Sequence, residues 1–444
     1  MKQKLTTFLL ALLVFSSLLL TYRLWYGHHP SRQVEPLDEK VPEKVFFELP
    51  RPLEDTITPE RILVESGDGD GFYLLRYGQE NFNLAWEEIS LALQALTKYE
   101  YRARESLGET GAGLKIWFNP PLPVGAGTPW LQEDRYRELA KLELWLDGEE
   151  SWAILQEKSG GDAMALKLPG RLATLFGEAA FADSTPYILL APELPDTVLS
   201  DRLSGGEELV VPLSPPVLPE LVLVQENLDR ESLVDAFFVD RNLVRKIQEK
   251  AGAVIYTDGT KGLRIKKGME FSDPIREKSL TPLAYLSALN ACNKYICSYG
   301  GWPAELRLKQ LIIHSEDGYR VGRACWEYYW KGYPLVGSNP ALSLVFTSSG
   351  LVEYCRLVYT VRSLGERLYQ VASWSSALEE ATDFYDRLYG ETSPPALEAI
   401  DLVYYVKGGP SYQPVAVPAW QVIINGKQIL LQAEDLTPFE GGDQ

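Results

Sequence analysis

Three histidines in the whole chain limit the acid–base and metal chemistry that the sequence supports. His28 and His29 precede the folded region, so a Ser–His or Cys–His catalytic pair would have to use His314, at the end of the apolar run LIIH. A single histidine in an apolar strand is usually structural, and no nucleophile elbow, zinc-protease motif or phosphate-binding loop occurs. Carboxylate pairs for glycoside hydrolysis must exist among 61 acids, but no pair stands out. We therefore predict a non-enzymatic protein with no metal and no cofactor.

Four cysteines are too few for a disulfide scaffold in a chain of 444 residues. Cys292 and Cys297 lie five residues apart on an expected helix, where their side chains do not face each other, so we predict free buried thiols. Cys325 and Cys355 fall in expected strands, where a cross-strand disulfide and two neighbouring thiols both remain open.

Three aromatic residues alternate along one expected strand. Trp326, Tyr328 and Trp330 would share a face, since side chains in a strand repeat every two residues. If exposed, they could stack on a sugar as a ligand-contact platform. If buried, they belong to the sheet core, which is the more frequent case for such a stripe.

The charge distribution argues against nucleic-acid partners. The net charge is −18, and the first 27 residues carry three bases and no acid. The remainder therefore holds 40 bases against 61 acids, a net charge of −21. Such a body is repelled by DNA and RNA.

The elements that position these residues begin with a hydrophobic segment. Leu5–Leu20 reads LTTFLLALLVFSSLLL and follows Lys2 and Lys4. A helix from Leu5 to Tyr22 would span about 27 Å, close to the roughly 30 Å hydrocarbon core. Bulky residues follow instead of a small-residue cleavage site, which favours an uncleaved anchor over a cleaved signal peptide. We predict a single-pass protein of the cell membrane, with a cytoplasmic N-terminus and the bulk of the chain extracytoplasmic.

One side of this helix forms a stripe at three- and four-residue steps. Its Ser and Thr hydroxyls could hydrogen-bond to a neighbouring transmembrane helix, although short polar residues also occur in membrane helices without such a partner. The predicted partner-binding stripe is Thr6, Leu10, Leu13, Ser17, Leu20 and Leu24.

Runs of strand and helix pattern predict an α+β protein after this helix, with helices packed on antiparallel meanders. We divide the chain into residues 1–27 (tail and anchor), 28–52 (stalk), 53–217 (N-terminal domain), 218–315 (central domain) and 316–444 (C-terminal domain). Helices are expected at 83–98, 229–250, 281–299 and 373–388. Asp229 is the expected N-cap of the second, and the first has an apolar side made by Leu84, Ile89, Leu91, Leu93 and Leu96. Hairpins are expected around residues 258–262 and at Asn425-Gly426.

Several segments, taken in order, resemble the YycH family of bitopic membrane proteins. They are LLVFSSLLLTYRLWYG, FFVDRNLVRKIQEKAGAVIYTDGTKGLRI, YRVGRACWEYYWKGYPL and YYVKGGPSYQPVAVPAWQVIINGK. The resemblance runs from the anchor to the last hairpin, and its most specific parts are Tyr256–Gly259 and Pro418–Trp420.

The resemblance implies a regulator of the essential sensor histidine kinase WalK, also called YycG, which controls cell-wall metabolism. It also implies a YycI-like membrane partner, whose soluble part would resemble the last two domains here. In that family the anchor helices contact those of the kinase, which assigns the stripe to partner binding. An exported module that binds cell-wall glycan or peptide is the alternative function.

Overall fold

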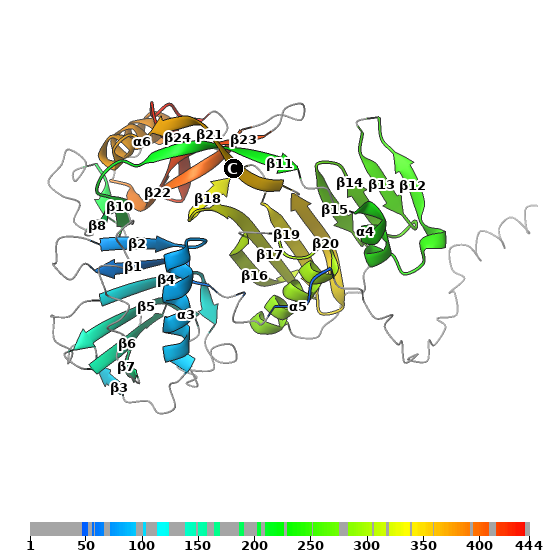
Figure 1. Cartoon of the computed structure of the whole chain (residues 1–444), viewed down its shortest axis with the longest axis horizontal. Coiled ribbons are helices and arrows are strands. Elements are labelled where there is room, and N and C mark those ends of the chain that lie inside the picture. The colour runs from blue at the N-terminus through cyan, green and yellow to red at the C-terminus, as the bar shows by residue number, and fades with distance from the viewer. Residues whose placement is uncertain are drawn as a thin grey trace, which may run out of the picture. The chain divides into compact units, whose positions relative to one another are not determined.

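Two large sheets, in which most strand pairs are antiparallel, make up most of the described chain (Figure 1). The computed structural model describes residues 47–439 apart from gaps, of which the longest are 104–112, 124–137, 169–185 and 191–201. These residues belong to one unit, Phe46–Gln444. No helix within the described ranges is long and apolar enough to cross a bilayer. The predicted anchor and its stripe lie outside them.

The first sheet has the strand order β10-β8-β2-β1-β4-β5-β6-β7-β3. Its strands are β1 (Arg61–Glu65), β2 (Phe72–Arg76), β3 (Tyr101–Ala103), β4 (Gly113–Pro123), β5 (Glu138–Asp147), β6 (Glu150–Glu157), β7 (Met164–Leu168), β8 (Pro186–Leu190) and β10 (Leu209–Pro212). Helix α3 (Glu80–Gln94) packs on one face through Phe82, Ile89 and Leu93. The apolar side expected from the sequence also included Leu84 and Leu91, and this was wrong: both are 58% exposed.

The second sheet has 15 strands, along the path β12-β13-β14-β15-β20-β19-β17-β18-β22-β23-β11-β21, with β16, β24 and β9 paired at its sides. Its strands are β9 (Ser204–Gly205), β11 (Val217–Gln225), β12 (Arg245–Gln248), β13 (Val254–Thr257), β14 (Gly262–Ile265), β15 (Gly268–Ser272), β16 (Leu306–Glu316), β17 (Tyr319–Trp330), β18 (Tyr333–Val336), β19 (Leu342–Thr347), β20 (Gly350–Leu357), β21 (Tyr359–Gln370), β22 (Ala396–Lys407), β23 (Val415–Ile424) and β24 (Lys427–Gln432). Strands from the predicted central and C-terminal domains are therefore interleaved, because β15 pairs with β20 and β11 lies between β21 and β23. The domain boundaries themselves stay a prediction.

Three helices and one short 3₁₀ turn accompany this sheet: α4 (Arg230–Phe237), η4 (Arg241–Leu243), α5 (Tyr285–Ser298) and α6 (Trp374–Tyr389). Helices α4 and α5 share a core in which the ring of Phe237 stacks on Tyr299 at 4.1 Å between centroids. Helix α6 is capped at both ends, by the Ser373 hydroxyl and by Gly390 in the left-handed conformation. The predicted α+β class is confirmed for the described residues, and the strand pairs are antiparallel as predicted except β18–β22 and β9–β22, which are parallel.

One helix prediction fails over half its length. Asp229 caps α4 as expected, accepting a hydrogen bond from the Glu231 backbone N–H. The helix ends at Phe237, however, and residues 245–248 form strand β12. Both hairpins are confirmed: β13 and β14 pair across the Asp258 turn, and Asn425 and Gly426 have φ of 47° and 71° between β23 and β24.

A buried charged contact joins the two sheets. Arg76 of β2 donates to the Asp401 carboxylate of β22 at 3.1 Å, and Arg61 lies 3.9 Å from the same carboxylate. The Arg76 guanidinium also lies over the ring of Tyr333 at 5.2 Å. Gly332 has φ of +88°, and a Cβ there would overlap the Arg76 side chain. Glycine is therefore required at this contact.

Candidate functional site

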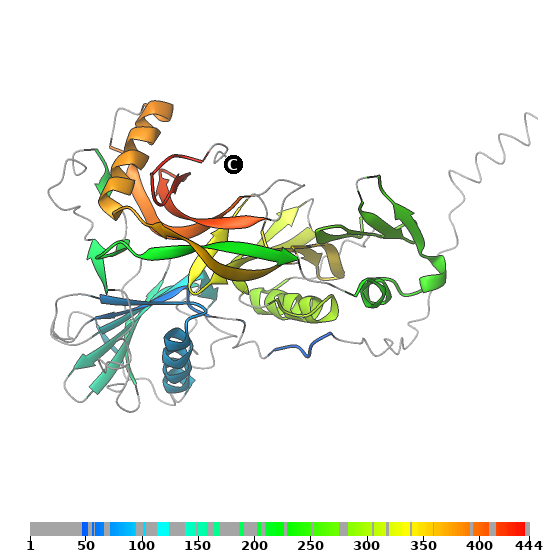
Figure 2. The ribbon, with the colours of Figure 1, turned by 45° about the horizontal axis from the view of Figure 1, so that its top comes forward.

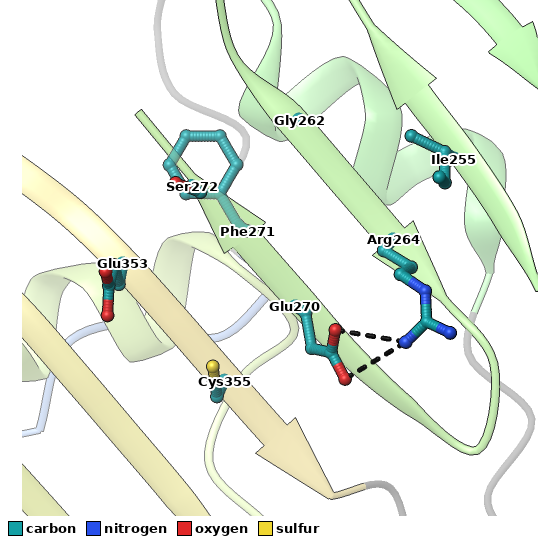
Figure 3. A pocket seen from close by; sticks show the side chains of 8 residues that line it. All are labelled: Ile255, Gly262, Arg264, Glu270, Phe271, Ser272, Glu353 and Cys355. Atoms are coloured by element: carbon teal, nitrogen blue, oxygen red, sulfur yellow. Dashed lines mark hydrogen bonds and ion pairs between the residues drawn. The ribbon is translucent and has the colours of Figure 1, made fainter. Parts of the chain in front are cut away.

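A hollow of about 320 Å³ lies on the open face of strands β14, β15 and β20 (Figure 3). Its lining residues are Ile255, Gly262, Arg264, Glu270, Phe271, Ser272, Glu353 and Cys355. Arg264 crosses it and forms ion pairs of 3.1 Å with both Glu249 and Glu270. The one cation among these lining residues is thus already paired with two carboxylates.

The thiols near this hollow are poor nucleophiles. All four cysteines are free, as predicted for Cys292 and Cys297, which are buried. Cys325 and Cys355 both lie opposite Ser343 of the intervening strand β19, so no bridge joins them. Burial raises the pKa of the Cys355 thiol, and the neighbouring Glu270 carboxylate adds to this effect. A thiol with a raised pKa holds little thiolate at neutral pH.

No group of three or more His, Cys, Asp or Glu side chains could hold a metal ion in the described part of the chain. His314, the one histidine there, lies in β16 and is 37% exposed. Its Nε2 is 3.4 Å from the Glu316 carboxylate. A surface contact of this kind accounts for the residue without a catalytic role.

The aromatic stripe of β17 lies largely in the core. Trp326 is 1% and Tyr328 5% exposed, and both belong to the largest hydrophobic cluster. Trp330 packs against that cluster, with its ring 5.6 Å from Tyr404. This favours the core interpretation, because a sugar cannot stack on a ring that is already covered. The alternative function as a glycan-binding module thereby loses its platform.

The first described residues, 47–51, are bound to helix α5, on the side of β20 away from the hollow (Figure 2). We call these residues the strap. The Phe47 N–H donates to the Cys297 carbonyl at 3.0 Å. The Asn293 amide nitrogen donates to the Arg51 carbonyl at 2.6 Å, and its oxygen accepts from the Arg51 N–H at 3.4 Å. The strap is thus fixed at both ends to one face of α5.

Trp302, just after α5, completes this attachment. Its backbone N–H donates to the Glu48 carboxylate at 2.8 Å, and its indole Nε1 donates to the Asn293 side-chain oxygen at 3.0 Å. The Arg51 guanidinium lies 5.1 Å from the centroid of the Trp302 ring, in the range of a cation–π contact. Phe47 and Leu49 remain 40% and 79% exposed. Polar groups therefore hold the strap more than apolar burial does.

The turn that receives the strap is anchored to the back of β20. The Tyr354 hydroxyl donates to the Tyr299 carbonyl at 3.2 Å, and Arg356 donates to the Gly301 carbonyl at 2.7 Å. Tyr354 and Arg356 alternate along β20 with Glu353 and Cys355, which line the hollow. One strand thus has the hollow on its open face and the strap's attachment on its covered face.

Sequence reasoning missed this attachment, because it assigned residues 28–52 to a stalk. One signal was present: Asn293 is a polar residue at a position of α5 that the spacing of Leu289, Cys292 and Ile296 makes a buried face. A buried amide must find hydrogen-bond partners, and here the strap and Trp302 supply them.

The geometry therefore defines an α+β protein whose described region offers surfaces for contact. No family model matches the chain, and no curated protein matches it. Among solved structures, it is similar to YycH from Bacillus subtilis, with a TM-score of 0.60 and 14% identity over 86% of this chain and 98% of that one. An uncharacterized protein from Eubacterium rectale matches with a TM-score of 0.36 and 11% identity, over 55% of this chain and 92% of that one. The chain has the fold of YycH, which confirms the predicted resemblance at the level of the fold.

Proposed function

We propose that this protein is a single-pass, non-enzymatic regulator of a WalK/YycG-like sensor histidine kinase, acting with a YycI-like partner at the cell membrane. The observation that carries the proposal is the fold match to YycH over 86% of the chain. The ordered sequence resemblance, which includes the anchor, supports it independently.

The strap supports a physical route for such regulation. A transmembrane helix changes kinase output only if it binds one signalling state better than the other. A difference of about 1.4 kcal/mol between the two states shifts their ratio tenfold. Residues 47–51, which follow the predicted anchor and stalk in the sequence, are hydrogen-bonded to α5, and the turn after α5 is hydrogen-bonded to β20, so a change at β20 can alter the attachment of the strap.

A matched pair of anchor variants tests the helix contact. Leu13→Ala/Leu20→Ala removes two residues of the predicted stripe, whereas Leu12→Ala/Leu19→Ala makes the same chemical change about 100° around the helix. The full chain and the full-length kinase would be reconstituted together in nanodiscs, and kinase autophosphorylation measured. We expect the stripe variant to lose the wild-type effect on the kinase and the control to keep it.

Equal loss in both variants would mean that the predicted stripe is not the contact. No effect of the wild-type chain on the kinase would remove the proposal altogether. Mature chains released from cells without their first two dozen residues would exclude regulation through the anchor.

A further inference from the structure

The segment from Val239 to Lys267 is a basic island in an acidic chain. It contains eight Lys or Arg and three Asp or Glu, a net charge of +5, whereas the whole chain has a net charge of −18. The segment covers η4 and the three strands β12, β13 and β14. Arg241 and Arg264 already pair with nearby carboxylates, so the charge that can attract an anionic partner lies on exposed cations such as Arg245 and Lys246.

Strand β12 is an open edge of the second sheet (Figure 1). All four of its residues are exposed, and β13 is its one neighbour among the described strands. The Glu249 N–H donates to the Ala253 carbonyl at 2.8 Å. In an antiparallel pair every second residue hydrogen-bonds to the neighbouring strand, so this bond shows which residues of β12 do so. Arg245 and Ile247 therefore point their backbone groups toward β13, whereas Lys246 and Gln248 point theirs outward. A further strand could pair with these outward groups.

Large apolar side chains lie exposed along the same segment. Val239 is 91%, Leu243 64% and Ile247 50% exposed. Ile247 lies opposite Ile255, which lines the hollow, so a strand added to β12 would extend the open face that carries the hollow. Charges such as those of Arg245 and Lys246 help to keep an edge strand from aggregating, but exposed apolar residues do not. Protection from aggregation therefore does not explain these apolar residues.

The charges also select the occupant. Pairing with β12 of a second copy would bring Arg245 and Lys246 close to their own counterparts, and like charges across a strand pair are destabilising. An acidic strand would instead place its carboxylates beside one of these cations, whichever face its acids occupy, since Arg245 and Lys246 point to opposite faces of the ladder.

We propose that β12 is a docking edge for an extended acidic segment of another protein, in which apolar residues alternate with Asp or Glu. The segment adds as a strand by pairing with the outward backbone groups of Lys246 and Gln248. Its carboxylates lie on the face of Lys246, and its apolar residues lie on the opposite face, where they cover Ile247.

The test uses the full chain in phosphatidylcholine nanodiscs and, as the probe, a capped nonapeptide of alternating Glu and Val. We expect saturable binding that weakens with salt, together with slower hydrogen exchange of the Lys246 and Gln248 amides. The same peptide with alternate amides N-methylated should not bind, because it cannot donate to the edge. The assay contains no kinase, so its failure is distinguishable from failure of the proposed function.

Three variants locate the site. Arg245→Glu/Lys246→Glu should weaken binding at least about tenfold, because it reverses two charges at the edge. Lys266→Glu/Lys267→Glu makes the same charge change at the β14–β15 turn and should weaken binding far less. Gln248→Pro removes an outward N–H without breaking a bond to β13, and should abolish binding while leaving thermal stability nearly unchanged.

Several outcomes would overturn the proposal. These are absence of peptide binding, equal loss in the two charge-reversal variants, or full binding by Gln248→Pro. Binding of the chain to vesicles containing phosphatidylglycerol but not to the peptide would make an anionic lipid surface the occupant. Dimers that dissociate in Arg245→Glu/Lys246→Glu would make it a second copy.

Discussion

Asn293→Ala should release the strap from α5 while the body stays folded. Asn293 is 2% exposed, and its amide makes two well-placed hydrogen bonds, to the Arg51 carbonyl at 2.6 Å and from the Trp302 indole at 3.0 Å. A hydrogen bond contributes about 0.5–1.5 kcal/mol net, and a buried group that loses its partner costs about 1–3 kcal/mol. Because the strap can detach and let water reach these groups, we expect a loss of about 2–3 kcal/mol in strap attachment rather than the full sum.

Hydrogen exchange of the Phe47 amide reports this attachment directly, because that N–H donates to the Cys297 carbonyl at 3.0 Å. A loss of about 2–3 kcal/mol corresponds to exchange about 30- to 150-fold faster. Asn290→Ala is the matched control, since it makes the same substitution at an exposed position of the same helix. Equal exchange rates in the two variants would refute the assignment of Asn293 as the residue that holds the strap.

Two further predictions concern stability. Gly332→Ala should lower the free energy of unfolding by more than Gly426→Ala. Both glycines have positive φ, but a Cβ at Gly332 also meets the Arg76 side chain, whereas a Cβ at Gly426 meets open space. Equal losses of the free energy of unfolding in urea would contradict the Arg76 contact. Burial, helped by the hydrogen bond to the Glu220 carboxylate, raises the pKa of Tyr369 to about 12. An unfolded Tyr titrates near pH 10, so the stability from this group is complete below pH 10 and is lost as the pH rises toward 12. Tyr369→Phe should therefore lose less stability than the wild type between pH 9 and 12, and identical pH profiles would count against this assignment.

The sequence predicted those elements whose local and tertiary preferences agree. Asn425-Gly426 needs two residues with positive φ, and these types adopt that conformation readily, so the hairpin could be placed in advance. Helix α6 has a serine at its start, a glycine at its end and an apolar side between them, and its observed bounds differ from the prediction by one residue at each end.

The wrong helix predictions concern apolar residues that are spaced as on a helix face but are exposed in the structure. Val239, Leu243 and Ile247 lie at four-residue steps, as in a helix, within the segment that was predicted to be helical to residue 250. The structure leaves all three exposed, so their spacing does not record a buried helix face. Leu84 and Leu91 of α3 misled in the same way. Apolar residues at helical spacing mark a buried helix face only where other residues pack on that face. A single sequence does not show which faces are packed.

The attachment of residues 47–51 could not be predicted for a related reason, since its partners lie more than 240 positions away in the chain. Its chemistry nevertheless bears on how regulation would work. Directional hydrogen bonds fix orientation, and a clamp worth a few kcal/mol can exist in both attached and released states. A ligand on the open face of β20 could change kinase output only by as much as its affinity differs between those two states. If regulation instead depends on the anchor helix alone, releasing the clamp would leave kinase output unchanged. The effect of Asn293→Ala on kinase output therefore shows whether the region after the anchor takes part in regulation.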